Sequence, residues 1–130
     1  MSDTISPHVL IIESDAFLAN IYRTAFESQN YKVSIAENGE NGCKDAIRKQ
    51  PNAILLDIML PKLDGFNVLE QLRNETKTKD LPIIILSSRG AREDIEKAFA
   101  FGAHDYIIKK QFSPDEIVER INALLAYNKK

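Results

Sequence analysis

The sequence lacks three features that would each point to a class of protein: paired cysteines, a long apolar run and an excess of one charge. Its single cysteine, Cys43, excludes an internal disulfide and a cysteine-based metal cluster, and we expect it to pack as a small residue on a helix. The 17 Lys and Arg residues nearly balance the 19 Asp and Glu residues, which gives a net charge of −2. This balance provides no electrostatic reason to expect direct binding to nucleic acid or to a membrane.

No apolar run approaches the roughly 20 residues that a transmembrane helix needs, and residues 1–7 are too polar for a signal peptide. We therefore expect a cytoplasmic protein. The length of 130 residues fits one domain. We predict that this domain covers residues 8–127, between short tails at 1–7 and 128–130.

Apolar residues follow strand and helix periods in turn along the chain. Continuous apolar runs, and one polar–apolar alternation in the second segment, predict strands at residues 8–13, 32–36, 53–57, 83–86 and 106–108. Helical spacing predicts intervening helices at about 15–26, 40–50, 66–72, 91–101 and 113–125. The inner face of the first helix is expected to include Phe17, and that of the fourth to include Phe99.

Strands that alternate with helices predict a parallel sheet covered on both faces. The most apolar strands, the first, third and fourth, should be central, whereas the alternating second strand should lie at an edge. The predicted fold is therefore an α/β, flavodoxin-like, doubly wound (βα)5 three-layer sandwich with strand order 2-1-3-4-5.

Polar residues stand at the C-terminal ends of four predicted strands: Glu13, Asp57, Ser87 and Lys109. Ligands bind at this edge of a parallel sheet, at the switch point, which here lies between the strands that end in Glu13 and Asp57. Each residue alone has a simple structural explanation, but four from separate strands form a chemical unit. Carboxylates suit Mg²⁺, a carboxylate can attack phosphorus, and a lysine and a hydroxyl can stabilise phosphoryl oxygens.

The motifs around these residues resemble the response-regulator receiver (CheY-like) family of two-component phosphorelay systems over nearly the whole chain. The matching stretches, in the family's order and spacing, are HVLIIES, AILLDIMLPKLDGF, PIIILSS and GAHDYIIKK. The resemblance implies that Asp57 accepts a phosphoryl group from a histidine kinase or a phosphotransfer protein. It also implies a Mg²⁺ cofactor, and a protein that catalyses only its own phosphorylation and dephosphorylation.

The resemblance also assigns roles to other residues. It implies that Glu13 and the backbone carbonyl of Met59 join Asp57 in binding Mg²⁺. Ser87 and Lys109 would contact the phosphoryl group, and Tyr106 would be the switch aromatic. The partner-binding change is expected on the face formed by the fourth helix, fifth strand and fifth helix, where relatives often dimerise. Its recipient would be a downstream protein or a fused output domain.

Two positions depart from the family pattern. Ser14 stands where the second metal-binding acid is usual, so Mg²⁺ binding should be weaker, unless the neighbouring Asp15 compensates. Asp15 is at least as well explained as an acid in the first turn of a helix, where the helix dipole favours it. After Lys109 the chain has Lys110-Gln111 in place of the family's proline, and the loop is one residue longer. A non-proline cis bond costs about 3 kcal/mol, so we expect a trans peptide.

Two other functions compete with an active receiver. Ser14 and the altered loop would also suit a pseudo-receiver, an interaction module with weak or no phosphorylation. An aspartate-nucleophile phosphatase of the haloacid-dehalogenase type would need a second Asp two residues after the nucleophile, where this chain has Met59.

Overall fold

The computed structural model describes residues 6–128, so most of the predicted tails, at 1–7 and 128–130, lies outside the described residues. The strands are β1 (His8–Ile12), β2 (Lys32–Ala36), β3 (Ala53–Asp57), β4 (Ile83–Ser87) and β5 (Asp105–Ile108). The helices are α1 (Ala16–Glu27), α2 (Gly39–Lys49), α3 (Gly65–Arg73), α4 (Arg92–Ala100), the short 3-10 helix η1 (Lys109–Gln111) and α5 (Pro114–Asn128).

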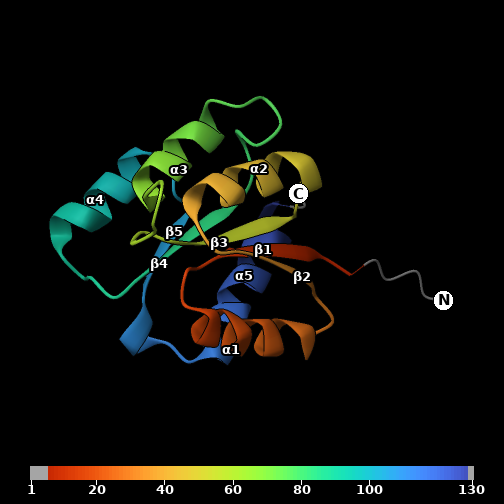
Figure 1. Ribbon diagram of the computed structural model, residues 1–130. Helices are drawn as coiled ribbons and strands as arrows, with labels where there is room; N and C mark the ends of the chain where they lie inside the picture. Colours follow the sequence, from red (N-terminus) through yellow and green to blue (C-terminus); the bar gives the residue numbers. More distant parts are fainter. Residues whose placement is uncertain (1–5, 129–130) are drawn as a thin grey trace.

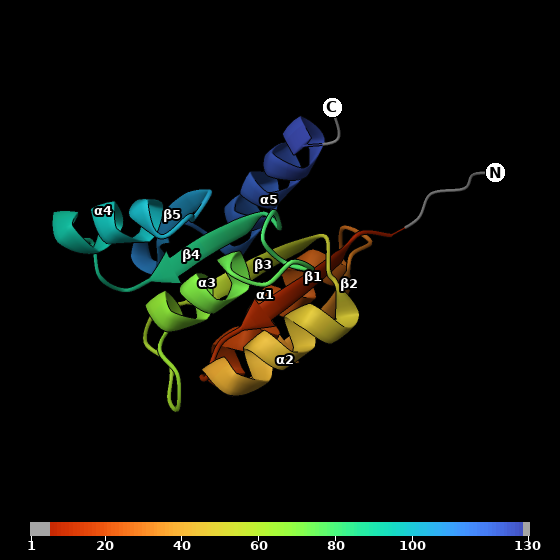
Figure 2. The same ribbon diagram turned by 90° about the horizontal axis from the view of Figure 1, so that it is seen from above.

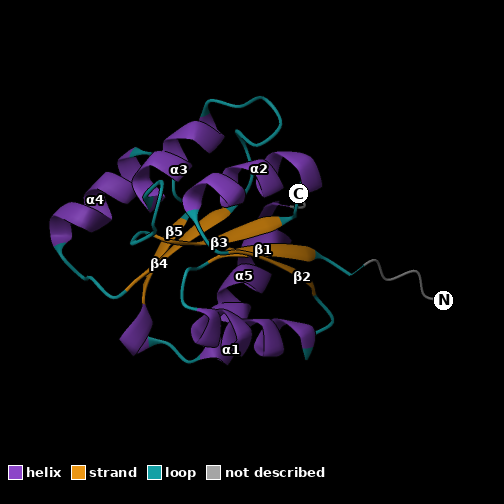
Figure 3. Ribbon diagram, viewed as in Figure 1, coloured by secondary structure: helices purple, strands orange, loops and turns teal. Residues whose placement is uncertain are grey.

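The strands form one parallel sheet in the order β2-β1-β3-β4-β5. Helices α1 and α5 cover one face, and α2, α3 and α4 cover the other (Figure 1). Figure 3 shows the sheet as a layer between these two layers of helices. The predicted three-layer fold and strand order are therefore confirmed, including the edge position of β2 and the central position of β1, β3 and β4.

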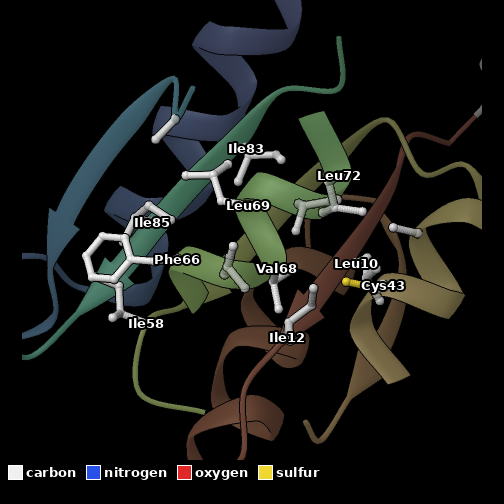
Figure 4. Close-up of a cluster of buried hydrophobic side chains, with 14 of the residues drawn as sticks. Leu10, Ile12, Cys43, Ile58, Phe66, Val68, Leu69, Leu72, Ile83 and Ile85 are labelled. Carbon is white, nitrogen blue, oxygen red and sulfur yellow. The ribbon is translucent and has the colours of Figure 1, made fainter. Parts of the chain in front are cut away.

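Side-chain alternation along the strands divides the core in two. In β1, Leu10 and Ile12 point into an upper cluster under α2, α3 and α4 (Figure 4). Val9 and Ile11 point into a lower cluster against α1 and α5. Because β1, β3 and β4 are buried on both faces, these strands show continuous apolar runs in the sequence. Cys43 lies in the upper cluster, as predicted.

Two aromatic side chains predicted to face inward are instead exposed. Phe17 is 74% exposed, because the buried stripe of α1 runs through Ala19 and Tyr22 and a residue two positions before Ala19 lies on the opposite side of the helix. Phe99 is 47% exposed, and Phe101, just after α4, packs on the upper cluster.

Side-chain caps and a glycine define the ends of three helices. Asp64 caps α3 by accepting from the Asn67 amide, and Ser113 and Glu116 form a reciprocal capping box at α5. Gly102 ends α4 at φ +103°, as its position after the predicted helix suggests. Within residues 6–128, no helix combines the length and hydrophobicity needed to cross a bilayer.

Candidate functional site

The fold brings the four predicted strand-end residues to one edge of the sheet. Glu13 follows β1, Asp57 ends β3, Ser87 ends β4 and Lys109 follows β5. Figure 2 shows these strands from above, side by side in the sheet. Only four polar or charged residues among those described are buried, and three of them, Glu13, Asp57 and Ser87, belong to this site. Because burial of polar groups is costly, their concentration at one edge indicates a built site.

Lys109 links the two carboxylates. Its Nζ lies 3.0 Å from Glu13 Oε1 and 3.2 Å from Asp57 Oδ2. A cation between the two acids offsets the repulsion that adjacent carboxylates would otherwise feel. The ammonium therefore acts as the counter-ion of the site.

The ionisation of this cluster reflects burial and mutual charge. Burial raises the pKa of Glu13, and the negative charge of Asp57 raises it further, against the opposing effect of Lys109. Burial also lowers the pKa of Lys109, but Asp57 and Glu13 together outweigh that effect, so the Lys109 pKa is raised overall. The ammonium form is thus secured at neutral pH, whereas the ionised form of Glu13 is disfavoured relative to an exposed glutamate.

Backbone amides orient the remaining carboxylate oxygens. Asp15 N–H donates to Glu13 Oε2 at 3.1 Å, and Met59 N–H donates to Asp57 Oδ1 at 3.1 Å. In both acids, one oxygen is held by the amide two residues later and the other by Lys109. The direction of each carboxylate is therefore fixed before any ligand binds.

The two residues considered beside Glu13 as metal ligands differ from it in burial and in contacts. Ser14 is exposed. The Asp15 carboxylate caps α1, where its Oδ1 accepts from Phe17 N at 2.9 Å and Leu18 N at 3.2 Å. Among the described residues, no three acidic, His or Cys side chains form a metal-binding group. Asp15 is thus the N-cap of α1, one position before the first turn in which the helix-dipole explanation placed it.

Ser87 and Tyr106 meet at the backbone of Arg89. Ser87 Oγ accepts from Arg89 N–H at 3.0 Å, and the Tyr106 hydroxyl donates to the Arg89 carbonyl at 2.7 Å. Burial raises the pKa of Tyr106, and the Ser87 hydroxyl acts in the opposite direction. The loop after β4 therefore connects the two residues. Sequence reasoning did not identify Arg89, because a backbone contact leaves no signal in side-chain type.

Lys109 reaches the site from the first residue of η1. No cis peptide bond occurs within residues 6–128, in agreement with the trans peptide expected after Lys109. Lys110 and Gln111 are exposed, so the ammonium at the acids is that of Lys109.

Comparison with known families identifies the chain. The family model described as the response regulator receiver domain matches residues 9–122. The chain belongs to this family. It is a receiver domain of the two-component response regulators, a signalling domain, as the motifs predicted.

Similar proteins agree with this assignment. The receiver is 38% identical over 119 residues to the DNA-binding dual master transcriptional regulator RpaA of Synechocystis sp.. The aligned region covers 92% of this chain and 49% of RpaA. It is 35% identical to the transcriptional regulatory protein ResD of Bacillus subtilis, over 96% of this chain and 50% of ResD. The chain thus spans about half the length of these relatives. A Francisella response regulator receiver domain superposes with a TM-score of 0.87 at 30% identity, over 95% of this chain and 99% of that one.

Proposed function

We propose that the receiver takes a phosphoryl group onto Asp57 from a histidine kinase or a phosphotransfer protein, in a Mg²⁺-dependent reaction in the cytoplasm. The observation that carries this proposal is the Lys109 ammonium held between the carboxylates of Glu13 and Asp57. An ion pair that only stabilised the fold would need one acid for the lysine. Two buried acids around one lysine, beside a buried serine, instead suit a reaction in which charge accumulates on phosphoryl oxygens.

Each side chain has a place in the transfer. A carboxylate oxygen of Asp57 attacks phosphorus, and the P–N bond of a phosphohistidine breaks. The bonding electron pair stays on the imidazole nitrogen, and the ring, which carries a proton on its other nitrogen, leaves as neutral imidazole. Lys109 keeps its positive charge and pairs with a phosphoryl oxygen. The Ser87 hydroxyl donates to another phosphoryl oxygen, which requires no change in its protonation state.

The donor set fits a hard cation with few protein ligands. Glu13 and Asp57 supply carboxylate oxygens, and the Met59 backbone carbonyl is the third proposed ligand; Mg²⁺ commonly keeps several waters beside one or two carboxylates. Bound there, Mg²⁺ would neutralise part of the charge on the transferred group. Because Ser14 is exposed and Asp15 caps α1, we propose that this set binds Mg²⁺ more weakly than a set with a third carboxylate.

The signal would leave through the face formed by α4, β5 and α5. Tyr106 lies on β5 and is tied to the loop after β4 through the Arg89 carbonyl, so a shift of Ser87 toward a phosphoryl group would change the surroundings of Tyr106. Phe99 on α4 is exposed, and we propose that its ring contributes apolar surface to this face. We propose that a downstream protein, a fused output domain or a second copy of the receiver binds there.

The test is phosphorylation with a small donor. The protein is incubated with Mg²⁺ and acetyl phosphate, or with beryllofluoride, and the adduct is measured by intact mass and by NMR. An adduct that requires Mg²⁺, disappears in Asp57→Ala and persists in the control Asp45→Asn on α2 supports the proposal. If no adduct forms at millimolar Mg²⁺, the domain is a pseudo-receiver.

A further inference from the structure

The turn that carries Lys109 has few contacts of its own. Lys109 is the first residue of η1, no side chain caps this turn, and both Lys110 and Gln111 are exposed. The turn also lacks a proline that would restrict its backbone. Contacts outside the turn must therefore hold the Lys109 ammonium at the two carboxylates.

One side chain of α5 contacts both ends of the segment that includes this turn. We call residues 105–112 the lysine segment; it begins with β5 and ends at Phe112. The Arg120 guanidinium forms an ion pair with Asp105 at the start of the segment. The same guanidinium lies over the ring of Phe112 at its end, with Cζ 4.8 Å from the ring centroid.

Both contacts of Arg120 are anchored to rigid parts of the fold. Asp105 pairs with Ile84 in the sheet, and Phe112 packs against the lower cluster. Along α5, Arg120 follows the Ser113–Glu116 capping box at the helix start and directly precedes the buried Ile121. The guanidinium thus fixes the distance between the two ends of the lysine segment.

We propose that Arg120 is a positioning residue for Lys109, which clamps the two ends of the lysine segment and so holds the Lys109 ammonium on Glu13 and Asp57. This inference rests on the proposed phosphorylation of Asp57. The clamp thereby restricts the backbone of this turn, as a proline after Lys109 would.

The role suits arginine specifically. A planar guanidinium can stack on an aromatic ring while its edge pairs with a carboxylate. The compact ammonium of a lysine at position 120 could keep the pair with Asp105 but would lose the planar stack on Phe112. Arg120→Lys should therefore retain part of the effect, and Arg120→Met should lose it.

The experiment is a double-mutant cycle on the rate of phosphorylation from acetyl phosphate at saturating Mg²⁺. Wild type, Arg120→Met, Lys109→Ala and the double variant are compared, with Arg48→Met as a matched control. Arg48 forms an exposed ion pair with Asp45 on α2, away from the lysine segment. Two protein concentrations are used, because Arg120 also lies on the face proposed for partner binding.

We expect Arg120→Met to slow phosphorylation 5- to 10-fold, Arg120→Lys to slow it about 2-fold, and Arg48→Met to leave it unchanged. Because Arg120 acts through Lys109, Arg120→Met should cause no further loss in the Lys109→Ala background. A loss of equal size in both backgrounds, or no loss in the single variant, would overturn the inference. So would an unchanged rate in Lys109→Ala, since that result removes Lys109 from the reaction.

A second readout does not depend on activity. Hydrogen–deuterium exchange of the backbone amides of residues 105–112 should be faster in Arg120→Met than in wild type and unchanged in Arg48→Met, because the clamp orders both ends of the lysine segment. If wild type forms no adduct, the proposed function fails, and this exchange measurement alone decides the inference. If the adduct forms but neither the exchange nor the rate responds to Arg120→Met, only the inference fails.

Discussion

Removal of the Lys109 charge is the sharpest test of the site's electrostatics. The substitution Lys109→Met keeps most of the apolar stem but leaves the carboxylates of Glu13 and Asp57 without their shared cation. Both acids are almost fully buried. We therefore expect a large loss of folding stability, although the lysine is a single residue at the end of the sheet.

The distances set the magnitude. Lys109 Nζ lies 3.0 Å from Glu13 Oε1 and 3.2 Å from Asp57 Oδ2, and each attraction contributes about 5 kcal/mol at an effective dielectric constant of about 20. Desolvation of the ammonium offsets several kcal/mol of this sum, and removal of one partner from a buried pair typically costs roughly 3–5 kcal/mol. Because the Lys109 side chain is 18% exposed, the lower end applies, about 3 kcal/mol.

The loss should depend on pH in a defined direction. The raised pKa of Glu13 means that the folded protein binds this proton more tightly than the unfolded chain, so the contribution of Glu13 to stability falls as pH rises above 4.5 and through the folded pKa. Without Lys109, which opposes this rise, the Glu13 pKa should increase further. The deficit of Lys109→Met should therefore shrink as pH falls from 7 to 5.

The assay is urea unfolding without Mg²⁺ at both pH values, on wild type, Lys109→Met and the double variant with Glu13→Gln. Lys110→Met, which changes the exposed neighbouring lysine, is the control and should match wild type. Glu13→Gln should restore at least half of the loss in Lys109→Met. A deficit below about 1 kcal/mol at pH 7, or no recovery in the double variant, would refute the shared counter-ion.

Three further results are expected. The first concerns the Mg²⁺ concentration that gives half of the maximal phosphorylation rate. Asp15→Asn, which keeps the helix cap, should change this concentration less than twofold, whereas Ser14→Asp should lower it severalfold by adding a carboxylate. A large rise in Asp15→Asn together with no change in Ser14→Asp would make Asp15 a ligand. Gly102→Ala should destabilise the fold by about 2 kcal/mol in urea unfolding, because φ is +103° and the added Cβ would lie 2.8 Å from Arg73 Nε. Burial, and then the charge of Arg73, lower the His104 pKa below 6.5. The contribution of His104 to stability is therefore complete above pH 6.5 and is lost as pH falls from there toward the folded pKa. In His104→Gln, the free energy of unfolding should no longer decrease with falling pH through the titration of this residue.

The architecture could be predicted from the sequence because burial on two faces leaves a distinct pattern. The continuous runs of β1, β3 and β4 can only be accommodated in the middle of a sheet. The strand-end acids, serine and lysine could be predicted together for the same reason, since parallel strands place their C-terminal ends at one edge. Three of the four are indeed joined by the ion pairs of Lys109.

The failures share a physical cause, which is that local spacing does not determine side-chain direction. Phe17 is one of the apolar residues that recur at helical spacing after Asp15. It nevertheless lies in the first turn of α1, opposite the buried stripe. The role of Asp15 as N-cap had a signal in the residue type itself, because Asp is among the preferred caps. The contacts of Arg120 with Asp105 and Phe112 had no such signal, since they depend on how α5 lies against β5.

The backbone amides that hold Glu13 and Asp57 also affect how the site responds to a ligand. A mobile glutamate loses roughly 1.5–2 kcal/mol of side-chain conformational freedom when it is immobilised. Here the Asp15 and Met59 amides and the Lys109 ammonium already immobilise both acids. The side-chain entropy of these carboxylates is therefore lost during folding and not when a cation or phosphoryl group binds. The temperature dependence of binding should then reflect changes in hydration rather than the ordering of side chains.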